Sequence, residues 1–139
     1  MKVVLDTNVF ISGVFFTGPP YRILSAWRDG DVKMVVSAEI LDEYRRVGDA
    51  LAEQFPDVDI GPILELVTVE AELVWASSLS EPVCKDSDDD KFIACAIAGG
   101  VKQVVSGDKH LLKVTGYKGI HVLTPRKFVD DYLDKKMES

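Results

Sequence analysis

Short runs of apolar, strand-forming residues alternate with helical segments along this chain, and this alternation limits the possible folds more than any other feature. Strands are expected at residues 2–5, 33–36, 103–106 and 120–123, and less clearly at 69–75. Helices are expected at about residues 20–28, 37–55, 60–66, 88–98 and 108–113, and from 125 onward. The alternation predicts an α/β fold with three layers, in which helices flank a mostly parallel central sheet.

The segment between the first strand and the first expected helix carries no such pattern. Asp6, Thr7 and Asn8 are most simply a turn, and residues 13–18 form a mixed connection that ends in a Gly-Pro-Pro break.

Length and composition indicate one domain that spans residues 1–139. The chain is 47% hydrophobic, which is enough to build a core without disulfides, and its only cysteines are Cys84 and Cys95. Neither a signal-peptide pattern nor an apolar run long enough to span a membrane is present in the sequence. These features predict a cytoplasmic protein without a membrane segment.

The charge balance counts against proteins that bind nucleic acid through bulk positive charge. There are 23 acidic and 16 basic residues, which gives a formal net charge of −7. A protein that binds nucleic acid through bulk positive charge would be basic. The two histidines, His110 and His121, are too few for a histidine-rich zinc site. An enzyme with its acids concentrated at a cation site remains compatible with this composition.

Two acids follow predicted strands. Asp6 comes directly after the first strand, and Asp108 stands two residues beyond Ser106. Functional groups in parallel α/β sheets gather beyond the carboxyl ends of the strands. Each acid taken alone is more simply a turn former or a helix N-cap.

Further acids lie on two helices that flank this edge. In the helix from Ser37, Glu43 lies closer to the apolar stripe than Glu39 or Asp42 and so points nearest the core. In the later helix, Asp88, Asp89 and Asp90 precede an apolar run, and helical geometry does not choose among these three.

Carboxylates gathered at one point repel one another unless a cation lies between them. Oxygen ligands select Mg²⁺ or Mn²⁺, and such ions assist hydrolysis at a phosphoryl centre. Hydrolysis of a phosphodiester is therefore the expected chemistry. A phosphatase that uses Asp6 as nucleophile is less favoured, because that pattern has a second aspartate where this chain has Asn8.

Four stretches of the sequence resemble, in order, the four acidic motifs of PIN domains. They are Leu5-Asp-Thr-Asn-Val9, Ser37-Ala-Glu-Ile-Leu-Asp-Glu43, Asp88-Asp-Asp-Lys-Phe-Ile-Ala94 and Val105-Ser-Gly-Asp108. The similarity covers nearly the whole chain and implies a PIN-like fold. It looks closest to single-domain prokaryotic toxin components of toxin–antitoxin systems, which are relatives of the VapC ribonucleases.

The resemblance also implies roles for particular residues. Four acids would bind the metal and act in catalysis: Asp6, Glu43, Asp90 and Asp108. Asp90 is preferred over Asp88 and Asp89 because the family's third acid stands just ahead of an apolar-Ile-Ala stretch; whether those two assist is left open. Small polar residues would support the site: Thr7, Asn8 and Ser106.

The activity implied by the resemblance is endonucleolytic hydrolysis of RNA with Mg²⁺ or Mn²⁺, as the toxin of a type II toxin–antitoxin pair. The implied partners are an RNA substrate, a small antitoxin protein and a second copy of the chain in a homodimer. The alternative is a binding module of the same fold that has lost turnover and acts through RNA or protein contacts. The acidic composition motivates this alternative.

Overall fold

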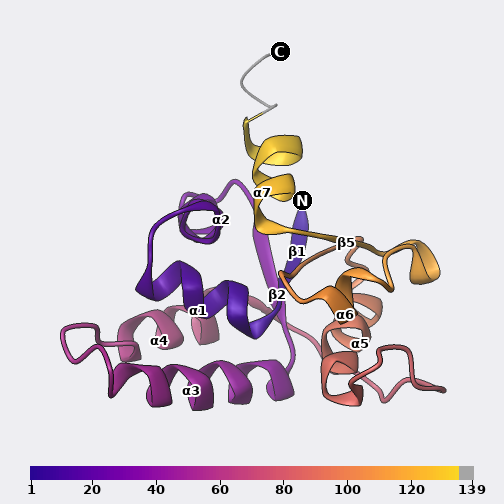
Figure 1. Cartoon of the computed structure of the whole chain (residues 1–139), viewed down its shortest axis with the longest axis horizontal. Helices are drawn as coiled ribbons and strands as arrows, with labels where there is room; N and C mark the ends of the chain where they lie inside the picture. Colours follow the sequence, from indigo (N-terminus) through magenta and orange to yellow (C-terminus); the bar gives the residue numbers. More distant parts are fainter. Residues whose placement is uncertain (135–139) are drawn as a thin grey trace.

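The computed structural model describes residues 1–134, and its centre is a five-stranded sheet with every strand parallel to its neighbours. The strand order is β3-β2-β1-β4-β5 (Figure 1). The strands are β1 (Lys2–Leu5), β2 (Lys33–Val36), β3 (Glu72–Leu73), β4 (Gln103–Val105) and β5 (His121–Leu123). The predicted sheet is confirmed, and it is parallel throughout.

Helices cover both faces of the sheet, which confirms the three-layer prediction. In Figure 1, α1 to α4 lie to one side of the strands, whereas α5 and α6 lie to the other. The described part of the chain has seven α-helices: α1 (Thr7–Phe15), α2 (Pro19–Arg28), α3 (Ala38–Ala52), α4 (Gly61–Glu70), α5 (Asp90–Gly99), α6 (Lys109–Leu112) and α7 (Pro125–Phe128). Shorter helical segments are η1 (Ser87–Asp89), η2 (Tyr117–Gly119) and the π-helical η3 (Val129–Asp134). No helix within residues 1–134 combines the length and the apolar character needed to cross a membrane.

Strand β1 lies at the centre of the sheet and of the core. Val3, Val4 and Leu5 are fully buried, because helices cover both faces of the strand. Leu5 is in register with Val105 of β4, so the residues that follow these two strands emerge side by side. The structure therefore brings the segments after β1 and β4 together at one edge of the sheet, as predicted.

Helix α1 was not predicted as an element, and it takes up the first part of the mixed connection expected at residues 13–18. Of the two structural roles given for Asp6, turn former or helix N-cap, the structure has the N-cap. The helix runs from Thr7 to Phe15 and begins with the Asp6 side chain, which accepts a hydrogen bond from the Val9 backbone N–H. Its buried residues include Thr7, Val9, Phe10, Ile11 and Gly13. Burial on several sides removes the polar face that makes a helix recognisable in a sequence.

The region between α3 and α5 also differs from the prediction. Helix α3 ends at Ala52 instead of residue 55, and α4 continues to Glu70, four residues beyond the expected end. The strand expected over residues 69–75 is reduced to Glu72 and Leu73. Both residues are exposed on an outer strand, so burial contributes little to fixing its length.

A buried tyrosine joins the central strand to the helix that carries Glu43. The Tyr44 hydroxyl donates a hydrogen bond of 2.5 Å to the Leu5 carbonyl, and the Tyr44 ring stacks on Phe10 at 4.1 Å between centroids. These contacts fix α3 against β1 and α1 one residue away from each of two predicted acids, Asp6 and Glu43.

Replacing Tyr44 with Phe tests this connection. The substitution keeps the stacked ring but removes the donor to a buried carbonyl, so we expect the free energy of unfolding to fall by about 1–2 kcal/mol. Urea denaturation followed by circular dichroism measures the change. Tyr21→Phe is the matched control, because Tyr21 is exposed and should tolerate the change. Equal stability of the two variants would contradict the role assigned to Tyr44.

Candidate active site

The carboxyl ends of the parallel strands form the edge at which the predicted acids meet. Asp6 is only 4% exposed, and its carboxyl group caps helix α1 by accepting from the Val9 N–H at 2.8 Å. A helix N-terminus favours a carboxylate because its free N–H groups are donors. The strand and the helix thus hold Asp6 from both sides.

Ser106 joins Asp6 to Asp108. The buried Ser106 hydroxyl donates to Oδ2 of Asp6, and it accepts a hydrogen bond of 2.9 Å from the Asp108 backbone N–H. The Asp108 carboxylate caps α6 by accepting from the His110 N–H at 2.8 Å. One serine therefore fixes the two strand-end acids relative to each other.

Asp89 is a third acid at this edge. It belongs to η1, is partly buried, and lies close enough to Asp108 for their carboxyl groups to interact. Burial, together with the negative charges of Asp108, Asp86 and Asp6, raises the pKa of Asp89 from 3.8 to about 6. The sequence analysis left open whether this residue contributes, and the structure places it beside the strand-end acids.

Burial likewise raises the pKa of the Asp6 carboxyl from 3.8 to about 6. The hydrogen bonds from Ser106 and Val9 oppose this effect, whereas the charges of Asp108 and Glu43 add to it. The carboxylate form of Asp6 is therefore held at a cost in free energy, and a nearby positive charge would stabilise it.

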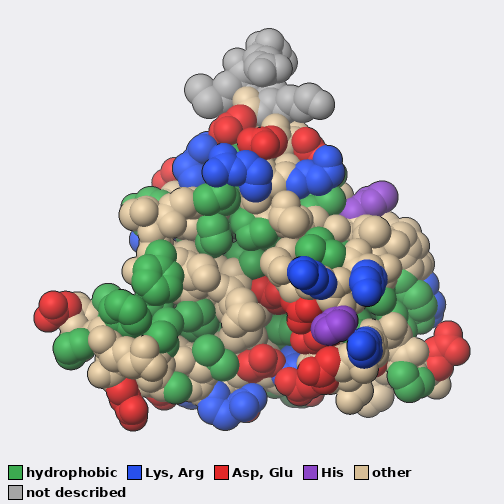
Figure 2. Space-filling view, viewed as in Figure 1, with side chains coloured by type: hydrophobic (Ala, Val, Ile, Leu, Met, Phe, Trp, Pro, Cys, Tyr) green, Lys and Arg blue, Asp and Glu red, His purple; other side chains and the backbone are tan. Residues whose placement is uncertain are grey.

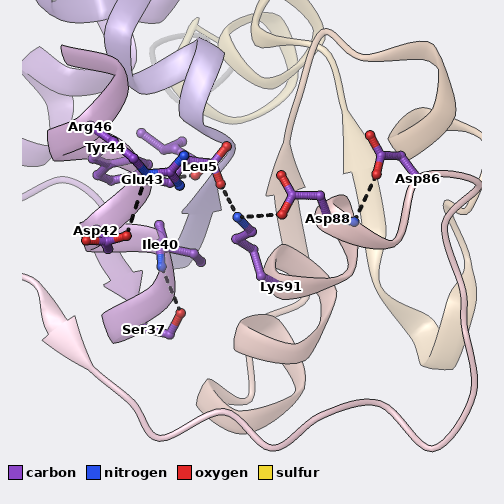
Figure 3. A network of polar contacts seen from close by, with 10 residues as sticks. All are labelled: Leu5, Ser37, Ile40, Asp42, Glu43, Tyr44, Arg46, Asp86, Asp88 and Lys91. Atoms are coloured by element: carbon purple, nitrogen blue, oxygen red, sulfur yellow. Dashed lines mark hydrogen bonds and ion pairs between the residues drawn. The ribbon is translucent and has the colours of Figure 1, made fainter. Parts of the chain in front are cut away.

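Glu43 faces this edge from helix α3 and is paired with Lys91 of helix α5 (Figure 3). Both side chains are only 16% exposed, and the Lys91 ammonium also lies 3.3 Å from Asp88. Burial lowers the pKa of Lys91, but the hydrogen bond to Glu43 and its charge outweigh burial and raise it. Glu43 thus already has a cation as its neighbour.

Asp90 is directed to a different partner. Its carboxylate accepts hydrogen bonds from the backbone N–H groups of Cys84 at 2.7 Å and Val83 at 3.3 Å. These bonds tie the start of α5 to the end of the preceding loop. The structure places Asp90 on the helix beside the edge, with its oxygens turned toward the loop.

The polar residues predicted to support the site take different positions. Thr7 is 4% exposed, and its hydroxyl has no hydrogen-bond partner among residues 1–134. Asn8 is exposed on the first turn of α1. An unpartnered buried hydroxyl next to Asp6 is a free oxygen donor at the edge.

The acidic edge is visible on the molecular surface. In Figure 2, acidic side chains gather near the middle of the face, between α1 and α3 on one side and α5 and α6 on the other. Basic side chains and a histidine border this group on the side of α6. The acids are therefore accessible to an ion or a substrate.

The donors at this edge fit a hard divalent cation by their chemistry. The carboxylates of Asp6, Asp89 and Asp108 repel one another, and the Thr7 hydroxyl lacks a partner, so oxygen ligands are available that a cation would satisfy. As they stand, no three Asp, Glu, His or Cys side chains in the described residues are grouped closely enough to hold a metal ion. Binding one would require side chains to turn.

Lys91 was given no role in the sequence analysis, although it closes a run of acids at the start of an apolar helix. The contribution of Asp89 was left open, because helical geometry did not choose among the three acids and the motif resemblance favoured Asp90. Residues 87–89 form a 3₁₀ helix, which rotates these acids relative to an α-helical projection.

Two known proteins are similar to this chain over most of its length. The uncharacterized protein MJ1680 of Methanocaldococcus jannaschii is 29% identical over 145 residues, which cover 95% of this chain and 92% of that protein. Among solved structures, a chain in the crystal structure of FitAcB from Neisseria gonorrhoeae is 22% identical with a TM-score of 0.49, covering 89% of this chain and 98% of that chain.

The family comparison covers the whole candidate site. The model described as PIN domain matches residues 2–110, from the start of β1 into α6. This span contains Asp6, Glu43, Asp90 and Asp108, together with the carboxyl edge of four of the five strands. The chain therefore belongs to the PIN domain family.

Proposed function

We propose that this protein is a ribonuclease that hydrolyses phosphodiester bonds within RNA chains with the help of Mg²⁺ or Mn²⁺. PIN domains are in general nucleases, and this supports hydrolysis of phosphodiesters as the reaction class. The observation that carries the proposal is the convergence of Asp6, Asp108 and Asp89 at the carboxyl edge, where burial and mutual repulsion raise the pKa of Asp6 and Asp89 to about 6.

The proposed catalytic and metal-binding acids are Asp6, Glu43, Asp90 and Asp108. The positions of Asp6 and Asp108 support their part in this set most directly, and we propose Asp89 as a further member because it lies beside Asp108. A bound divalent cation would supply hydroxide from water and offset negative charge on the phosphoryl oxygens.

The chain's own residues position these acids. The Ser106 hydroxyl donates to the Asp6 carboxylate and accepts from the Asp108 backbone N–H, whereas the Asp108 carboxylate itself is held by the His110 N–H. Lys91 holds Glu43 from the opposite helix and keeps that carboxylate from drifting toward solvent. Such preorganisation lowers the cost of assembling a site at the moment of reaction.

A second candidate is a binding module of the same fold that has lost turnover. One observation favours it: Glu43 and Asp90 are both engaged by protein groups, Glu43 by Lys91 and Asp90 by the loop backbone. A module of this kind would take up no Mn²⁺, whereas the ribonuclease would bind it. Calorimetric titration with Mn²⁺ separates the two.

The proposed partners are an RNA substrate, a small antitoxin and a second copy of the chain. Their support comes from the motif resemblance, and each stays a prediction. A gene for a short DNA-binding protein beside this one would support the antitoxin, and sedimentation analysis would measure the dimer.

We expect Asp6→Asn to lower the rate of cleavage of single-stranded RNA in Mn²⁺ by more than about 100-fold. The change removes the negative charge of a proposed ligand, so the divalent cation would bind more weakly. A denaturing gel with an end-labelled oligonucleotide measures the rate. Asp42→Asn is the matched control, since it makes the same change on an α3 side chain that is 76% exposed and pairs only with Arg46 in the described residues, at 3.7 Å.

Full activity in Asp6→Asn, or activity that survives a chelator, would contradict this prediction. Equal cleavage of single-stranded DNA of the same sequence would contradict the RNA preference alone.

The metal-free protein should lose stability as the pH rises from about 4 to about 6. The pKa of Asp6 is raised from 3.8 to about 6 in the folded state, so the folded state binds this proton more tightly than the unfolded chain does. The stability that protonation contributes is complete below about pH 4 and is lost as the pH passes 6. The loss is on the order of 3 kcal/mol for this group.

Urea denaturation in chelator at a series of pH values measures this loss, and Asp6→Asn should flatten the profile. Added Mn²⁺ should restore wild-type stability above pH 6 and have little effect at pH 4.5, where protons occupy the carboxyl group. A wild-type profile as flat as that of the variant would rule out the raised pKa.

Asp89→Asn and Asp90→Asn distinguish the two neighbouring acids. We expect both to slow cleavage, but only Asp90→Asn to lower the free energy of unfolding, by about 1–2 kcal/mol, because it disrupts the hydrogen bonds from Cys84 and Val83. Cleavage rates and urea midpoints are measured on the same preparations. Full activity in Asp90→Asn would remove Asp90 from the proposed set and leave Asp89 in its place.

A further inference from the structure

A cavity opens beside the acidic edge, on the side of β2 and β3. It has a volume of about 390 Å³ and lies between the loop of residues 76–82 and the first turns of α3 and α5. Lys91 and Asp90 line it, and the Lys91 ammonium is bound to Glu43. The cavity therefore adjoins the proposed catalytic site at Asp90 and Lys91.

Trp75 stands at the start of this loop with its side chain in solvent. It is 88% exposed, more than any other large hydrophobic residue in the described part of the chain. The preceding residue, Val74, donates from its backbone N–H to the Val36 carbonyl at 2.9 Å, which continues the pairing of β3 with β2. Trp75 thus stands at the carboxyl end of β3, on the same edge of the sheet as Asp6.

The lining of the cavity suits a nucleobase better than a phosphate. Ser77, Ser78 and Ser80 offer hydroxyl groups, and Leu79 and Pro82 offer apolar surface. Carboxylates of Glu39 and Glu81 also line it; these repel a phosphate but accept hydrogen bonds from the N–H groups of a base. An uncharged ring with N–H donors could pack on the apolar residues and hydrogen-bond to the hydroxyl and carboxylate groups.

The charge of the chain points the same way. With a net charge of −7, binding through phosphate contacts alone would be weak. Proteins that hold single strands combine contacts to the phosphates with stacking of bases on aromatic side chains, so a chain with few phosphate contacts depends more on the stacking. Trp75 is placed to supply it.

We propose that Trp75 and the adjoining cavity form a base-binding subsite for single-stranded RNA. One base stacks on Trp75, the next enters the cavity, and the adjoining backbone passes Lys91 toward Asp6 and Asp108. The proposal rests on the proposed ribonuclease function, whose substrate it specifies as unpaired RNA.

Tryptophan fluorescence tests the subsite directly, since the chain has only two tryptophans and Trp27 is buried at 7% exposure. A single-stranded oligoadenylate is titrated into the full chain in chelator, so that no cleavage occurs. We expect the RNA to quench Trp75 emission and to protect it from acrylamide. Trp75→Phe should abolish the change, because only the buried Trp27 then emits.

Affinity measurements with the same labelled oligoadenylate complete the test. Trp75→Ala should weaken binding by about tenfold, and Trp75→Phe by less, because it keeps an aromatic face. Tyr21→Ala is the matched control, since it removes an exposed aromatic ring on α2, outside the cavity lining, and should bind as the wild type does. In cleavage assays with Mn²⁺, Trp75→Ala should raise KM by about tenfold and leave kcat within about twofold.

Several outcomes would overturn the subsite. They are unchanged affinity and KM in Trp75→Ala, equal quenching by an RNA duplex of the same length, or a fluorescence change that depends on protein concentration without RNA. The last would assign Trp75 to a contact between copies of the chain. Binding that depends on Trp75 without any cleavage by the wild type would support the subsite and contradict the ribonuclease.

Discussion

The burial of one carboxyl group, Asp6, at the end of the central strand is the constraint on which the rest of the site depends. A buried carboxylate is tolerated only where donors surround it. The fold supplies these as the first turn of α1 and the Ser106 hydroxyl, which arrives on the neighbouring strand. Parallel pairing of β1 with β4 is therefore a requirement of the site as well as of the core.

The same constraint explains why the acids are gathered yet not neutralised. Hydrogen bonds from Ser106 and Val9 offset only part of the cost of burying the Asp6 carboxylate. The like charges of Asp108 and Glu43 disfavour its ionised form further. The nearby Lys91 ammonium is already paired with Glu43 and Asp88. What remains is a local excess of negative charge at a surface that solvent reaches, which is the electrostatic condition for recruiting a divalent cation.

The sequence predicted most of the fold, because apolar strand runs and strong helix signals such as Ser37, Gly100 and Pro125 are local features. It failed at α1, whose burial hides its periodicity, and at β3, which is too short and exposed to leave a pattern. Within the site, the strand-end positions of Asp6 and Asp108 followed from topology. The choice between Asp89 and Asp90 did not, since a single 3₁₀ turn decides which carboxyl group faces Asp108.

The outer strands have a consequence for how this protein associates with itself. β3 has two residues and β5 has three, so each border of the sheet exposes very little backbone that a foreign strand could pair with. Edge-to-edge addition, the common route from a soluble sheet to an aggregate, finds almost no template here. Strand addition at either border of the sheet is therefore disfavoured as a way for copies of this chain to associate.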